Sequence, residues 1–301
     1  MTDFAADRSS GSSQVALEFL AETEHWAAID TSGTPAAFRA ALLARLRAAQ
    51  VAQPTMALVH QLAARALDVA DTGVARGDGV ADLRDHLVRS CAVERDDLAT
   101  AQAAVARTAA RLVTERGAWI ATLSASGAVR EAVLEAQRAG REPRVLVGEG
   151  RPLFEGRSLA AALAAAGIPV WLMVDAALPL LLSQARMVWL GADAITEQGV
   201  LNKVGSFAAA LAAREHSVPV YALAARRKFL PAATRALTIA EMPAAEVWKT
   251  PAEGVRPRNV YFEVVPLPLV RGIVVEDAVL GPTEAAALAR ERALPGELAG
   301  G

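Results

Sequence analysis

Residues 119–127 read Trp-Ile-Ala-Thr-Leu-Ser-Ala-Ser-Gly, a short apolar run followed by small and hydroxyl-bearing residues. Apolar runs of this kind alternate with helical patterns through the rest of the chain. Strand, helix and strand repeated in this way are typical of βαβ units and a doubly wound parallel sheet. We therefore predict strands at 119–123, 145–147, 169–174, 187–190 and 218–223, with helices at 128–138, 158–166 and 202–215.

The first part of the chain has a different character. Only two of the 15 prolines, Pro35 and Pro54, precede residue 143, and a stretch without proline is compatible with long helices. Thr34 before Pro35 is typical of a helix start, because a capping side chain precedes a proline at the first helical position. We predict helices at 14–29, 35–50, 55–70 and 79–113, the third ending before Gly73. The fold class is thus α/β, with an N-terminal helical bundle at 1–116 and a sheet domain at 117–301.

Charge and composition exclude several classes of protein. The chain has 31 basic and 33 acidic residues, so bulk positive charge does not favour direct nucleic-acid binding. One cysteine and four scattered histidines provide neither a disulfide framework nor a metal-ligand pattern. The apolar run 168–182 is interrupted by Asp175 and Pro179 and is shorter than the ~20 residues of a membrane span. We expect no membrane association, no metal and no cofactor, since a P-loop and a dinucleotide fingerprint are also absent.

Polar residues follow the predicted strands, at the edge where open α/β sheets bind their ligands. Carboxylates can hold sugar hydroxyls, whereas arginine, lysine and helix N-terminal amides can hold phosphate. This combination suits a polyhydroxylated anionic ligand. The candidates in chain order are Ser124 and Ser126, Glu149 and Arg151, Asp175, Asp193, and Lys228.

Several of these residues also have a purely structural interpretation. Asp175 and Asp193 can cap the helices that follow their strands. Residues 202–206, Asn-Lys-Val-Gly-Ser, resemble a helix start whose free amides meet an anion, but Lys203 can equally be a solvated side chain. The adjacent Arg226 and Arg227 fit surface charge as well as a phosphate clamp.

Segments of the second domain occur in the order and spacing of a known family's motifs. Residues 147–156 look like V-x-E-x-R-P-x-x-x-G, residues 167–176 like G-I-P-V followed by D-S-A, and residues 191–206 like G-A-D-x-I followed by N-K-x-G-T. The chain resembles the family that contains the alpha, beta and delta subunits of eukaryotic translation initiation factor 2B. The same family contains aldose–ketose isomerases that act on methylthioribose 1-phosphate and ribose 1,5-bisphosphate. The resemblance covers about residues 117–284.

The resemblance implies a helical N-terminal domain, a Rossmann-like C-terminal domain and a ligand pocket between them. It also implies a homodimer formed through the C-terminal domain. Arg8, Gly11 and Ser12 correspond to a phosphate-binding loop of the isomerases. Asn202 and Lys203 fall in the N-K-x-G motif.

In the isomerases, a cysteine after the first strand and the aspartate of G-A-D form an acid–base pair. The resemblance places Ser124 and Asp193 at these positions. A thiol with a pKa of about 8.5 can be tuned to exchange protons near neutral pH. A serine hydroxyl is far more basic, and the neighbouring sequence supplies no histidine to activate Ser124.

We therefore expect a cytoplasmic protein that binds a phosphorylated sugar or a nucleoside monophosphate, with Ser124 as a hydrogen-bonding group. The alternative is an active sugar 1-phosphate aldose–ketose isomerase, or a relative with altered chemistry, in which Asp193 is the acid–base group beside Ser124. The expected ligand-binding residues are Arg8, Gly11, Ser12, Ser126, Glu149, Arg151, Asp175, Asn202, Lys203 and Lys228.

Overall fold

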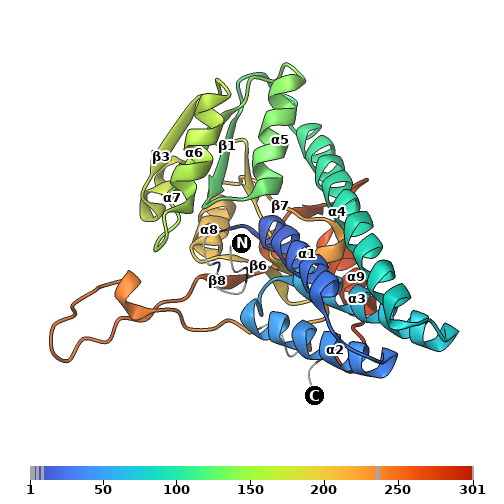
Figure 1. Cartoon of the computed structure of the whole chain (residues 1–301). Coiled ribbons are helices and arrows are strands. Elements are labelled where there is room, and N and C mark those ends of the chain that lie inside the picture. The colour runs from blue at the N-terminus through green and yellow to red at the C-terminus, as the bar shows by residue number, and fades with distance from the viewer. Residues whose placement is uncertain (1–3, 5–6, 8–9, 235–237, 300–301) are drawn as a thin grey trace.

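The computed structural model describes residues 4, 7, 10–234 and 238–299 (Figure 1). Its first part is helical, and the side chain of Thr34 accepts a hydrogen bond from the Ala37 N–H at 3.2 Å, as expected of a helix cap. Large apolar side chains such as Phe38 and Leu83 are completely buried between these helices. The helices are α1 (Ser12–Ile29), α2 (Pro35–Ala52), α3 (Ala57–Arg76) and α4 (Val80–Ala110).

Helix α3 runs past Gly73, so the predicted end before that residue is wrong. A Cβ atom at Gly73 would lie 2.3 Å from Leu83 Cδ2, which means that this glycine lets α3 approach α4 closely. The helix ends instead at Arg76, because Gly77 adopts a left-handed conformation with φ of 82°. Glycine in this helix therefore marks a packing contact and not a helix end.

The second part contains a seven-stranded sheet in the order β10-β9-β7-β4-β1-β2-β3. All neighbouring strands are parallel except β9 and β10. The predicted α/β fold class, with a helical part followed by a mostly parallel sheet, is confirmed. The strands are β1 (Trp119–Leu123), β2 (Arg144–Gly148), β3 (Val170–Met173), β4 (Met187–Leu190), β7 (Val220–Leu223), β9 (Gly272–Val274) and β10 (Val279–Leu280).

Helices cover both faces of this sheet. One face packs against α7 (Leu178–Leu181), α8 (Ser206–Glu215) and α9 (Pro282–Glu291). The other face packs against α5 (Gly127–Arg138), α6 (Glu155–Ala165) and the last turns of α4.

Helix α4 contributes to two hydrophobic cores. Its first turns bury Leu83 and Leu87 among the N-terminal helices, whereas Val105 and Ala109 pack against the sheet. The division of the chain at residue 116 stays a prediction. The structure shows that α4, which precedes this residue, packs both among the N-terminal helices and against the sheet.

A second, three-stranded antiparallel sheet was not foreseen. It consists of β5 (Ala194–Ile195), β6 (Gly199–Lys203) and β8 (Phe262–Pro266). The predicted helix start at Asn202 is wrong, because Asn202 and Lys203 end strand β6 and pair with β8. Gly205, with φ of 101°, separates this strand from α8. A short apolar run cannot be assigned to strand or helix by its period alone, which explains the error.

The segment between β7 and β8 includes an arm that extends away from the body of the molecule (Figure 1). At its base, Asn259 Nδ2 and the Tyr261 hydroxyl donate hydrogen bonds to the Glu246 carboxylate, at 2.8 and 2.5 Å. Among the described residues, none of the helices combines the length and the apolar character needed to cross a membrane.

Candidate functional site

A cavity of about 470 Å³ lies where the start of α1 meets the carboxyl ends of β1 and β4 and the end of β6. This volume falls in the range of about 300–1,000 Å³ that is usual for small-molecule sites. Eight of the predicted site residues line it: Gly11, Ser12, Ser124, Ser126, Asp193, Asn202, Lys203 and Lys228.

Lys228 lies in the cavity wall and is 6% exposed. Its ammonium group donates hydrogen bonds to Ser12 Oγ at 2.7 Å and to the Ala192 carbonyl at 2.6 Å. Burial lowers the pKa of Lys228, while the negative charge of Asp193 opposes this change. This lysine therefore links the first residue of α1 to the loop that follows β4.

Asp193 follows β4 and is 8% exposed. Burial raises the pKa of its carboxyl group, against the opposing charge of Lys228 and the Ser12 hydroxyl. The backbone holds this residue from two sides, since its N–H donates to the Leu201 carbonyl and its carbonyl accepts from the Ala57 N–H, at 2.8 and 3.0 Å. A carboxyl group with a raised pKa is suited to proton exchange nearer to neutral pH.

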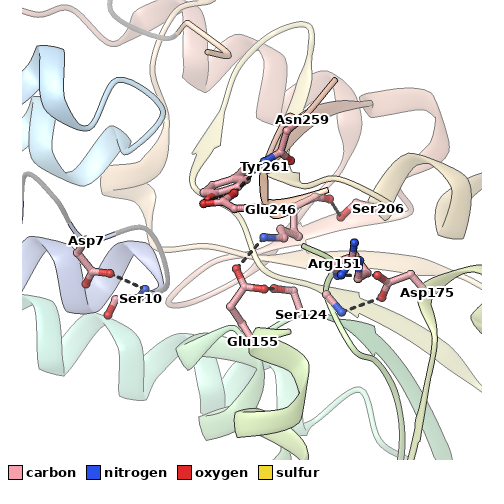
Figure 2. A network of polar contacts seen from close by, with 12 residues as sticks. Asp7, Ser10, Ser124, Arg151, Glu155, Asp175, Ser206, Glu246, Asn259 and Tyr261 are labelled. Atoms are coloured by element: carbon pink, nitrogen blue, oxygen red, sulfur yellow. Dashed lines mark hydrogen bonds and ion pairs between the residues drawn. The ribbon is translucent and has the colours of Figure 1, made fainter. Parts of the chain in front are cut away.

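Glu155, the first residue of α6, lines the cavity and belongs to a second polar group; Figure 2 shows its side chain beside Ser124. Its carboxylate accepts a hydrogen bond from Lys203 Nζ at 2.7 Å and another from Ser124 Oγ at 3.5 Å. The Lys203 ammonium also lies 4.7 Å from the centre of the Tyr261 ring. Sequence reasoning did not select Glu155, although it stands directly beside Gly156 at the end of the first family motif.

The backbone brings Ser124 close to the loop after β2. Ser124 has φ of 62°, in the left-handed region that non-glycine residues rarely occupy. A Cβ atom at Gly150 would lie 3.0 Å from Ser124 Cα, so only glycine permits this approach without a shift. Strained residues of this kind are concentrated at functional sites.

Two further predicted residues, Ser126 and Asn202, form hydrogen bonds that stabilise the surrounding structure. Ser126 Oγ caps α5 by accepting a hydrogen bond from the Val129 N–H at 3.4 Å. The Asn202 amide donates to Ser206 Oγ at 2.9 Å, which in turn donates to the Lys203 carbonyl at 2.6 Å. The two bonds of the Ser206 hydroxyl position the end of β6 against the start of α8.

Glu149, Arg151 and Asp175 do not line the cavity. The Asp175 carboxylate accepts hydrogen bonds from the Gly150 and Arg151 N–H groups at 2.8 and 2.7 Å, so it stabilises the loop after β2 (Figure 2). Glu149 accepts a hydrogen bond from Arg157 at 2.8 Å. Arg8 lies outside the described residues. Among the residues that are described, no group of three or more His, Cys, Asp or Glu side chains is arranged to hold a metal ion.

The fold and cavity define an α/β protein with a helical N-terminal part and a polar site at the carboxyl ends of its strands. The model of the Initiation factor 2 subunit family matches residues 8–282. The chain therefore belongs to this family.

The family's relatives carry two kinds of name. A putative translation initiation factor eIF-2B subunit 2-like protein of Pyrococcus furiosus is 35% identical over 180 residues, covering 59% of this chain and 63% of the relative. The ribose 1,5-bisphosphate isomerase of Archaeoglobus fulgidus is 31% identical over 223 residues, covering 72% and 70%. The alignment thus spans less than two thirds of the first relative's length.

A solved structure shows the same fold. The crystal structure of the Pyrococcus horikoshii translation initiation factor eIF-2B superposes with a TM-score of 0.78 at 27% identity. The match covers 93% of this chain and 94% of that chain.

Proposed function

We propose that the chain binds a phosphorylated sugar or a nucleoside monophosphate in the cavity. One observation supports this proposal: the same cavity is lined by a buried ammonium group, a helix N-terminus and two carboxyl groups. Membership in a family with a ribose 1,5-bisphosphate isomerase supports the same ligand class.

The phosphate is assigned to the start of α1. Gly11, Ser12 and Ser13 line the cavity there, and the first N–H groups of a helix have no partner within the helix. Lys228 adds a positive charge beside Ser12. Phosphate at this position would receive charge-assisted hydrogen bonds from both.

The sugar hydroxyls are assigned to the other polar groups of the cavity lining. Asp193, beside Ser12 and Lys228, and Glu155, beside Lys203, provide acceptors, and the Ser124 hydroxyl provides a further hydrogen-bonding group. Glu149, Arg151 and Asp175 take no part in this proposal, because they lie outside the cavity lining.

Titration calorimetry with ribose 1-phosphate, ribose 1,5-bisphosphate, methylthioribose 1-phosphate and AMP tests the proposal. At least one of these ligands is expected to bind with a measurable heat, while inorganic phosphate alone binds more weakly. Absence of heat from all four, with protein shown to be folded by circular dichroism, would overturn it.

Isomerase activity is a second candidate function, favoured by the raised pKa of the Asp193 carboxyl group opposite Glu155. It predicts turnover of a sugar 1-phosphate that the Asp193→Asn variant abolishes while ligand binding survives. No product above background with the whole set of sugar 1-phosphates would exclude this candidate and leave the binding proposal standing.

We also propose that the chain forms a homodimer through the sheet domain. Strand β3 is an edge strand, and its Trp171 and Leu172 are 48% and 45% exposed. Apolar side chains on an unpaired strand edge favour association with another chain. Sedimentation velocity is expected to give a dimer that Trp171→Glu converts to a monomer, and a monomeric native chain would contradict this.

A further inference from the structure

Lys228 is the last residue of a single 3₁₀ turn, Arg226–Lys228, that follows β7. One side of this turn is attached to the sheet, because the Arg226 guanidinium forms an ion pair with Asp277 at 2.8 Å. Asp277 lies between β9 and β10, and its side chain is 70% exposed. This first attachment is a solvated surface pair, and pairs of that kind contribute little to stability.

Arg227 attaches the same turn to the helical part of the chain. Its guanidinium forms an ion pair with the carboxylate of Glu94 on α4 and another, at 3.1 Å, with Asp97 of the same helix. Glu94 is only 5% exposed, and burying a carboxylate is costly unless it is paired. Its second oxygen lies 3.5 Å from Arg65 Nε on α3. The Glu94 carboxylate is thus held within the helical part, and the turn is attached to it through Arg227.

The proposed phosphate site is divided between the two parts of the chain. Gly11 and Ser12 stand at the start of α1, which packs among the N-terminal helices, whereas Lys228 follows a strand of the sheet. The Lys228 ammonium lies 2.7 Å from Ser12 Oγ, so a shift of the turn would separate the two phosphate-binding groups. The ion pair of Glu94 with Arg227 joins the helical part to the residue directly before Lys228.

We propose that Glu94 and Arg227 are positioning residues for the phosphate site, because their ion pair holds Lys228 against the start of α1. Neither side chain lines the cavity, so we expect both to act on a bound ligand through Lys228. The inference rests on the proposed function, since it needs a phosphate to bind beside Lys228. It adds a determinant of ligand affinity that lies outside the cavity lining.

Titration calorimetry of Glu94→Gln and Arg227→Met tests the proposal. The probe is the tightest binder to the native chain among ribose 1-phosphate, ribose 1,5-bisphosphate, methylthioribose 1-phosphate and AMP. Each variant breaks the pair from one side and is expected to bind the probe about tenfold more weakly, a size usual for coupled neighbouring groups. Arg227→Lys should recover most of the affinity, since an ammonium group can still pair with Glu94.

Arg226→Met provides the matched control. It is the same substitution at the adjacent arginine of the same turn, and the two side chains are similarly exposed, at 34% and 35%. It removes the surface pair with Asp277 and leaves the attachment of Arg227 to α4 in place. We expect this variant to bind the probe as the native chain does, with folding of every variant checked by circular dichroism.

The Lys228→Met background separates positioning from general destabilisation. If the ion pair acts through Lys228, adding Arg227→Met to Lys228→Met should cause no further loss of affinity, because the group that it positions is gone. A purely structural role would lower the affinity again in the double variant.

Three results would overturn the inference. The first is native affinity in both Glu94→Gln and Arg227→Met. The second is an equal loss in the Arg226→Met control, and the third is a further loss of the same size in the Lys228→Met background. If none of the four ligands binds to the native chain, the proposed function itself fails.

Discussion

The two cavity lysines are equally buried but have different partners. Lys203 and Lys228 are each 6% exposed. Lys203 forms an ion pair with Glu155 at 2.7 Å, whereas Lys228 donates to the neutral oxygens of Ser12 and Ala192. The charge of Lys203 is therefore balanced by a direct ion pair, whereas Lys228 has the nearby charge of Asp193 and donates its hydrogen bonds to neutral oxygens. On the proposed function, a bound phosphate would add a direct negative partner for Lys228.

Breaking the Lys203 ion pair is expected to have the largest effect on stability. Glu155→Gln leaves Lys203 buried without a carboxylate, which should cost about 3 kcal/mol of unfolding free energy. The double variant Glu155→Gln with Lys203→Met should recover most of this loss, because no unpaired charge remains. Urea denaturation measures both, and a single variant as stable as the native chain would show that the pair is not structurally important.

Removing the Lys228 charge is expected to act on binding more than on folding. Lys228→Met should weaken phosphosugar binding by about 2 kcal/mol or more, roughly 30-fold. Lys249→Met, at an exposed lysine outside the cavity, is the control and should bind normally. Calorimetry on folded variants compares them, and equal affinity of the two variants would remove Lys228 from the phosphate site.

Removing the Ser12 hydroxyl beside Lys228 should lower the stability more than removing the Ser124 hydroxyl beside Glu155. Ser12→Ala removes an acceptor 2.7 Å from the Lys228 ammonium, and hydrogen bonds to charged groups contribute about 1.5–3 kcal/mol. Ser124→Ala removes a contact of 3.5 Å to Glu155, so its cost should be under about 1 kcal/mol. Urea denaturation of the two variants checks the order, and a larger loss for Ser124→Ala would reverse it.

The smallest expected effect is a change in the pH dependence of stability. Because the folded pKa of Asp193 is raised above 3.8, the folded state holds a proton that the unfolded state releases. The contribution of Asp193 to stability therefore falls as pH rises from 3.8 through the raised pKa. Asp193→Asn should remove this part of the slope in unfolding free energies measured between about pH 4 and 7.

Variants of the two lysines should change the pKa of Asp193 by different amounts. Lys228 is the main positive charge that lowers the Asp193 pKa, and Lys203 contributes less. Lys228→Met should therefore extend the falling part of the curve to higher pH than Lys203→Met does. The opposite order would mean that Lys203 is the stronger electrostatic partner of Asp193.

Five strands of the seven-stranded sheet could be predicted because they are short apolar runs with clear boundaries, whereas β9 and β10 were not predicted. Strands β1 and β4 begin and end at the predicted residues. The antiparallel sheet was missed because β6 pairs with β8, and Lys203 meets Phe262 only after a long intervening segment. Pairing at such a separation leaves no local period in the sequence.

The cavity could be predicted only in part for the same reason. Residues that follow strands were found from their positions, and Asp193 and Lys228 do line the cavity. Glu155 meets its partner across 48 residues, and Asp175 accepts a hydrogen bond from Gly150, 25 residues before it. Whether a carboxylate faces a ligand or a backbone amide is decided by such contacts, which the sequence does not display.

Helix α4 has a mechanical consequence for ligand entry. Its first turns are packed among the N-terminal helices and its last turns against the sheet, so this one helix connects the two hydrophobic cores. A hinge motion between the helical part and the sheet would have to expose the buried side chains of Leu83 and Leu87 at one end of α4, or those of Val105 and Ala109 at the other. Exposing apolar surface to water costs free energy. On the proposed function, we therefore expect a ligand to reach the cavity without a hinge motion between the helical part and the sheet.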